Sequence, residues 1–106
     1  MPAELRDAVD RLVGRVQHWT PSRWERPSEV AGASRADLVH ALAQRLADAG
    51  ADAEGEVRRA VPRLDNDLAL PDQIRVLASD ALAGGASPEV IEALAADVTT
   101  TASHLG

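Results

Sequence analysis

The apolar positions of the first twenty residues recur at spacings of four and three, as on one face of an α-helix. This stripe consists of Leu5, Val9, Leu12, Val16 and Trp19. Pro2 suits the first turn of a helix, whereas Pro21 disfavours helical backbone in the residue before it. The pattern therefore predicts a first helix over about residues 3–18.

A second helix is predicted by its start signal and its apolar face. Ser34 and Asp37 form a variant of the capping box, which predicts a helix over about 34–49 that ends at Gly50. Over 52–60, acidic residues come first and arginines last, as the dipole of a short helix favours. A glycine inside this stretch weakens the prediction of a helix there.

Two helices are predicted in the last third of the chain. One runs from about 68 or 71 to 83 and is followed by two glycines. The other spans about 88–99, with Ser87 as its N-cap and Pro88 at its first position. A β-branched run at its end predicts a frayed tail over about 100–106.

Composition supports the helical interpretation and a single domain over 1–106. The chain has 21 alanines and no phenylalanine or tyrosine, which favours helix over strand. Four helices and a possible fifth, joined mostly by short turns, predict an all-α bundle with mostly antiparallel neighbours. The exception is an irregular segment over 20–33, rich in Trp, Arg and Pro. Arginine replaces lysine throughout, which is typical of a GC-rich bacterial genome.

Other features bear on the class of protein. Cysteine is absent, which excludes disulfides and thiolate metal sites. The start of the chain is acidic, without the apolar stretch of a secretory leader. No run approaches the roughly 20 apolar residues of a membrane span. We therefore expect a cytoplasmic protein with no membrane association.

Charge is distributed unevenly along the chain. The net charge of −6 falls entirely within residues 64–106, whereas residues 1–63 are neutral. A negative surface repels phosphate backbones, so nucleic-acid binding is disfavoured. The acidic part suits a basic protein partner, or serves solubility alone. A nucleic-acid-binding regulator of the helix-turn-helix kind remains the alternative, and the best basic patch for it is Arg58, Arg59 and Arg63.

Residues that could support catalysis or metal binding are few. The histidines lack the paired spacing of helix-borne metal ligands: His18, His40 and His104. The acidic cluster Asp65, Asp67 and Asp72 lacks the spacing of a calcium loop, and helix capping explains it better. Without a glycine-rich phosphate loop or a nucleophile motif, we expect no catalytic residues, no metal and no cofactor.

One segment is enriched in the residue types that dominate protein interfaces. Both tryptophans lie between residues 15 and 26, together with three arginines and His18. The candidate interaction surface is Trp19, Arg23, Trp24 and Arg26. Trp19 also continues the stripe of the first helix, which favours core packing. Trp24 could either anchor the segment onto the bundle or stay exposed for contact.

These observations predict a small, non-enzymatic protein–protein interaction module whose partner is unidentified. The apolar stripe of the first helix also fits a short heptad pattern. It covers only about two heptads, so we expect a monomer, with a weak dimer as the alternative.

Overall fold

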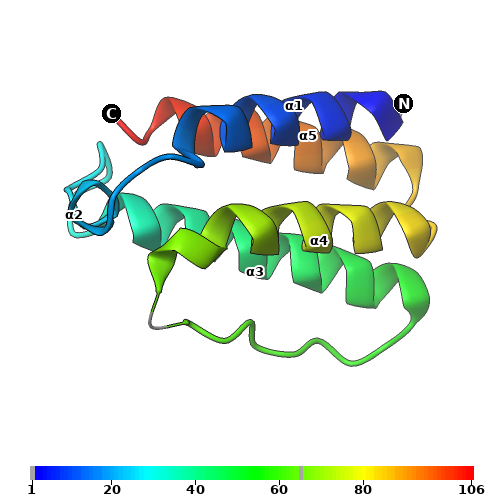
Figure 1. The fold of residues 1–106 in the computed structure, drawn as a ribbon. Helices are drawn as coiled ribbons and strands as arrows, with labels where there is room; N and C mark the ends of the chain where they lie inside the picture. Colours follow the sequence, from blue (N-terminus) through cyan, green and yellow to red (C-terminus); the bar gives the residue numbers. More distant parts are fainter. Residues whose placement is uncertain (1, 65) are drawn as a thin grey trace.

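The computed structural model describes residues 2–64 and 66–106, which form the predicted all-helical bundle (Figure 1). Its elements are α1 (Pro2–Val16), α2 (Pro21–Trp24), α3 (Arg35–Glu54), the 3-10 turn η1 (Asp67–Ala69), α4 (Leu70–Ala83) and α5 (Pro88–Ser103). The described residues contain no strand, only an isolated β-bridge between Pro27 and Ser34. None of the described helices has the length and apolar character needed to cross a bilayer.

The four long helices form two layers, α1 with α5 and α3 with α4 (Figure 1). Within each layer the helices run parallel: Arg15, late in α1, reaches the carbonyl of Ala102, late in α5. Antiparallel neighbours occur only between the layers, which differs from the expectation of mostly antiparallel pairs. The reason is the segment 55–64, which runs back along α3, so that α4 starts at the same end as α3.

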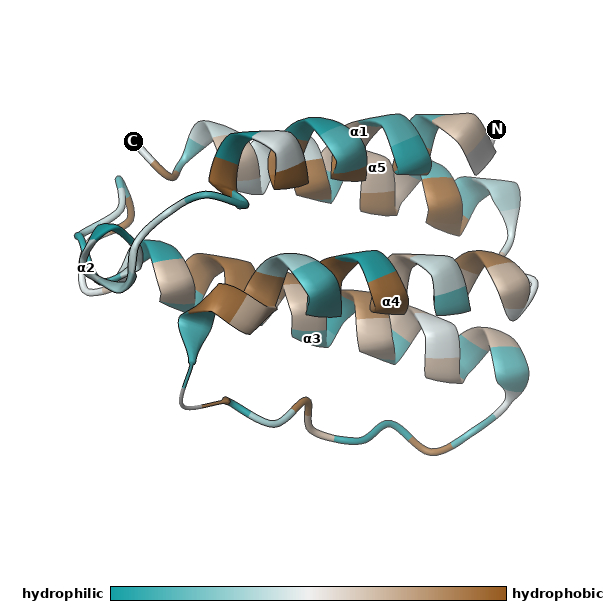
Figure 2. Ribbon diagram, in the orientation of Figure 1, coloured by the Kyte–Doolittle hydropathy of each residue, from teal (hydrophilic) through white to brown (hydrophobic). Residues whose placement is uncertain are grey.

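The core lies between the two layers, where the apolar faces of the helices meet (Figure 2). Every residue of the predicted stripe in the first helix is buried. The stripe is thus occupied within the monomer and is not available for the heptad-type dimer. The largest side chains that are fully buried are Trp24, Leu5, Leu12, Leu42, Leu46, Ile74 and Leu105.

The second predicted helix is longer than expected, because α3 continues through Gly50 to Glu54. A Cβ added at Gly50 would lie 3.7 Å from the backbone of Ala81, which is an ordinary van der Waals contact. Glycine inside a helix costs about 1 kcal/mol relative to alanine, and the packing of α3 against α4 outweighs this cost. The helix ends at Gly55, whose φ of 69° is left-handed.

The prediction of a separate short helix over 52–60 is wrong. Residues 52–54 belong to the end of α3, and the remaining residues are extended. The side-chain amide of Gln44 replaces the missing helix bonds, donating to the Arg59 carbonyl at 3.0 Å and accepting from the Val61 amide at 2.7 Å. His40 Nε2 lies 3.1 Å from the carbonyl of Val61. Side chains of α3 therefore hold this segment against the bundle.

The frayed tail predicted over 100–106 is also wrong. The helix α5 continues to Ser103, and both Thr101 and Leu105 are buried. The β-branched run lowers intrinsic helix propensity, but burial of one face outweighs this effect. The end of the chain is thus part of the packed core.

Candidate interaction surface

The two tryptophans lie at the end of the bundle that carries α2, and both are buried. Trp24 is 0% and Trp19 is 6% exposed. Their rings meet edge to face, with centroids 5.0 Å apart and planes at 69°. Trp24 therefore anchors the segment onto the bundle. The alternative in which its indole stays exposed for contact is wrong.

The local sequence explains why α2 forms where it does. Thr20 is the N-cap, its hydroxyl accepting from the backbone N–H of Arg23 at 3.3 Å. Pro21 follows in the first helical turn, where its missing N–H costs nothing. Three residues after Pro21, the turn ends at Trp24. Its side chain points into the core, and Nε1 has no hydrogen-bond partner in the described part of the chain.

Two arginines from other helices complete this end of the bundle. The guanidinium carbon of Arg35 lies 4.8 Å from the centroid of the Trp19 ring, and its Nε donates to the carbonyl of Leu105 at 2.9 Å. Arg15 donates to the carbonyls of Ala102 at 2.7 Å and Gly106 at 2.9 Å. These bonds satisfy carbonyls at the end of α5 that have no partner within the helix.

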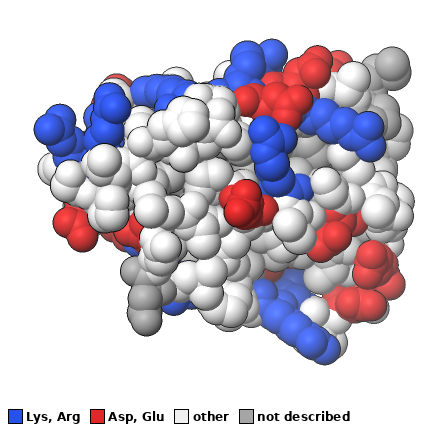
Figure 3. All heavy atoms as spheres, viewed as in Figure 1, with Lys and Arg blue, Asp and Glu red and all other residues white. Residues whose placement is uncertain are grey.

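Positive charge accumulates around these contacts. Desolvation lowers the pKa of Arg35, and the nearby guanidiniums of Arg26, Arg23 and Arg15 lower it further. Four guanidiniums gathered at one end of the bundle form a region of positive potential. Figure 3 shows arginine side chains at the end of the molecule that carries α2.

Arg23 and Arg26 are the outward-facing members of the predicted surface. Both side chains are exposed, and the guanidinium carbon of Arg23 lies 5.7 Å from the Trp19 centroid. Among the residues that the structure describes, neither arginine lies within 4.0 Å of a carboxylate. The structure thus divides the four predicted residues: two tryptophans face inward and two arginines face outward.

Sequence reasoning missed Arg35 and gave Arg15 no role. Arg15 lies four residues before Trp19, a spacing that places two side chains on one helix face. Arg35 is separated from Trp19 by the whole irregular segment, so no local pattern indicates their contact. Only the packing of α3 beside α2 brings them together.

Four arginines elsewhere in the described chain form ion pairs with carboxylates: Arg45, Arg58, Arg63 and Arg75. In the basic patch noted in the sequence, two of the three arginines are neutralised by carboxylates: Arg58 binds Asp52 at 2.7 Å, and Arg63 binds Asp37 at 3.0 Å. Within that patch, Arg59 alone has no ion pair to a described residue. The patch therefore offers little free positive charge.

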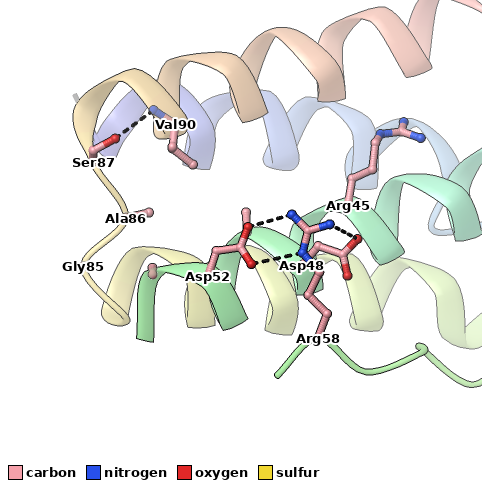
Figure 4. A pocket seen from close by; sticks show the side chains of 10 residues that line it. Arg45, Asp48, Asp52, Arg58, Gly85, Ala86, Ser87 and Val90 are labelled. Carbon is pink, nitrogen blue, oxygen red and sulfur yellow. Dashed lines mark hydrogen bonds and ion pairs between the residues drawn. The ribbon is translucent and has the colours of Figure 1, made fainter. Parts of the chain in front are cut away.

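A cavity of about 460 Å³ lies between the second half of α3 and the turn from α4 to α5 (Figure 4). Arg58 enters it from the extended segment and forms two bonds to the carboxylate of Asp52, at 3.0 and 2.7 Å. Asp48 lies 3.8 Å from the same guanidinium. The Ser87 hydroxyl accepts from the Val90 amide at 3.3 Å. The charged side chains that line the cavity are thus paired with one another or with other residues of the protein. The one hydroxyl in the lining, that of Ser87, caps α5.

The described members of the acidic cluster Asp65, Asp67 and Asp72, for which helix capping was the preferred interpretation, have separate roles. Asp65 lies outside the described residues. Asn66, not an aspartate, caps η1 by accepting from the Leu68 amide at 3.0 Å. Asp72 lies in the first turn of α4, where the helix dipole favours negative charge. The described residues contain no group of three or more His, Cys, Asp or Glu arranged to hold a metal ion.

The chain matches no protein-family model, no curated protein and no solved structure. Inference about function therefore depends on the surfaces of the molecule itself.

Proposed function

We propose that this protein is a non-enzymatic interaction module that binds an acidic segment of a partner protein through Arg23 and Arg26. The observation that supports it is a pair of exposed guanidiniums, Arg23 in α2 and Arg26 just after it, neither with a carboxylate partner in the described chain. They lie beside the positively charged Arg15 and Arg35. Guanidinium groups bind carboxylates through two parallel hydrogen bonds, which makes arginine suited to this recognition.

The support for α2 favours this role. Its position depends on the buried Trp24 and on the Thr20 cap. A short turn held in this way loses little conformational freedom when a partner binds, which favours affinity. Arg15 and Arg35 hold the end of α5, while their charge adds to the positive potential around α2.

Fluorescence anisotropy with a labelled peptide of alternating Glu and Ser tests the proposal. The double variant Arg23→Ala/Arg26→Ala is compared with Arg6→Ala/Arg11→Ala, which removes the same charge from exposed arginines of α1. We expect the first variant to bind about tenfold more weakly than wild type, since two charge-assisted contacts are lost. The second should stay within about twofold, because distant charges are largely screened. Equal losses in both variants would contradict the proposal.

The alternative is a nucleic-acid-binding regulator. Its best basic patch is largely neutralised by Asp52 and Asp37, and α5 contains no lysine or arginine. A labelled DNA duplex in the same assay separates the two proposals. We expect weaker binding of the duplex than of the acidic peptide at low salt, because the net charge is −6. Tighter binding of the duplex would favour the regulator.

A further inference from the structure

A groove runs along the outer side of the α3–α4 layer, between α4 and the extended segment 55–64. It consists of two adjoining hollows of about 320 and 240 Å³, both lined by Leu77. Leu64 and Val76 line the first hollow, and Val57 and Gly50 line the second. The extended segment thus forms one wall and α4 the other, with α3 contributing to the second hollow.

Exposed aliphatic side chains are concentrated along this groove. The structure describes six exposed large hydrophobic residues, and three of them line this groove: Val57, Leu64 and Val76. Val57 is 82% and Val76 is 58% exposed. Single exposed aliphatics are common on protein surfaces, but a contiguous group of them marks an interaction site. In Figure 3 the area over α4 on the face in view is partly white, with red acidic side chains within it.

Carboxylates line the same groove. Asp72 borders the first hollow, and Asp80, Glu54 and Glu56 border the second. None of these four forms an ion pair with another described residue, and Arg59 is the only arginine that lines either hollow. The groove therefore combines an apolar floor with an excess of negative charge.

We propose that this groove binds an amphipathic helix of a partner protein, with aliphatic residues on one face and lysines or arginines beside it. An apolar face at i, i+3, i+4 and i+7 fits between two walls of this kind. Basic flanks match the carboxylates of the groove. A second copy of this chain is a poorer occupant, because a two-fold axis at this face would bring Asp72 and Asp80 close to the same carboxylates of the copy. This surface is separate from the one on α2.

The test uses two short synthetic peptides with leucine at i, i+3, i+4 and i+7. One has lysine and the other glutamate at the remaining positions. Binding is measured by anisotropy for wild type, Val76→Ser and Val90→Ser, where Val90 is an exposed valine of α5 outside the groove. Circular dichroism checks that both variants are folded.

We expect the lysine peptide to bind at least about tenfold more tightly than the glutamate peptide, because of the groove carboxylates. Val76→Ser should weaken its binding about fivefold through lost apolar burial, and Val90→Ser by less than about twofold. Equal effects of the two substitutions, or none, would mean that charge alone attracts the peptide and would overturn the proposal. It would also be overturned if wild type sediments as a dimer that Val76→Ser dissociates, because the occupant would then be a second copy.

Discussion

Trp19 and Trp24 meet edge to face with their ring centroids 5.0 Å apart. Trp19 extends the apolar stripe that begins in α1, and Trp24 ends α2. The contact therefore fixes the irregular segment to the bundle and determines where Arg23 and Arg26 are presented. Both the stability of this end of the molecule and its proposed binding role depend on it.

Trp24→Ala should lower the free energy of unfolding by about 3–5 kcal/mol, because it leaves a large cavity in the core. Trp24→Phe should lower it by much less. Phenylalanine keeps an apolar ring and removes an N–H that is buried without a described partner. Urea denaturation monitored by circular dichroism measures both values. A loss below about 1 kcal/mol in Trp24→Ala would contradict the anchoring role.

The single-tryptophan variants Trp19→Phe and Trp24→Phe should each show blue-shifted emission and weak quenching by acrylamide, since both indoles are buried. Comparison with the same variants in urea gives the fully exposed reference. A red-shifted and readily quenched Trp24 would mean that α2 detaches from the bundle in solution.

The four long helices followed from local patterns, but their arrangement did not. Ser34 and Ser87 were predicted as N-caps from the residues beside them, and both cap in the structure. The continuation of α3 through Gly50 follows from its packing against α4, which is far away in sequence. The parallel layers depend on a segment that Gln44 holds in extended form. Such long-range contacts have no counterpart in helical periodicity.

The two glycines at 14 and 55 should respond in opposite directions to alanine. Gly14 lies exposed within α1, where an added Cβ would meet nothing within 4 Å. Gly14→Ala should therefore raise the free energy of unfolding by about 1 kcal/mol. Gly55→Ala should lower it by about 1 kcal/mol, because a φ of 69° strains an L-residue. Urea titrations compare the two variants, and equal signs would contradict the assigned backbone conformations.

Asp37 should make stability depend on pH. Its carboxylate accepts from the Ser34 backbone N–H at 2.9 Å and from Arg63 at 3.0 Å. The backbone hydrogen bond, followed by the Arg63 bond, lowers the pKa of Asp37 below its ordinary value of 3.8. The folded state thus binds its proton less readily than the unfolded state, and ionised Asp37 stabilises the fold above that ordinary pKa.

The expected result is that Asp37→Asn is less stable than wild type at neutral pH. The difference should shrink as the pH falls below about 4 toward the pKa of the folded state, where wild type also loses the charge. Urea denaturation at neutral pH and at several acidic values measures this. A difference that stays constant over that range would show that the carboxylate charge makes no contribution.

For the candidate surface, sequence reasoning identified the right segment but not which side chains face outward. Tryptophan and arginine are both common in interfaces, so composition alone cannot separate the anchor from the contact. The burial of Trp24 in the structure identifies it as the anchor and leaves the arginines as the contact residues. The contact of Arg35 with Trp19 depends on how α3 packs and has no signal in the spacing of residues.

The most direct test of Arg23 and Arg26 as the contact surface is a 1H–15N NMR titration of the protein with the Glu/Ser peptide. We predict that amide shifts concentrate in residues 20–35 and at Arg15, and that Arg23→Ala/Arg26→Ala removes them. Shifts centred on Arg6 and Arg11, or no shifts at millimolar peptide, would contradict the assignment of this end of the bundle as the contact surface.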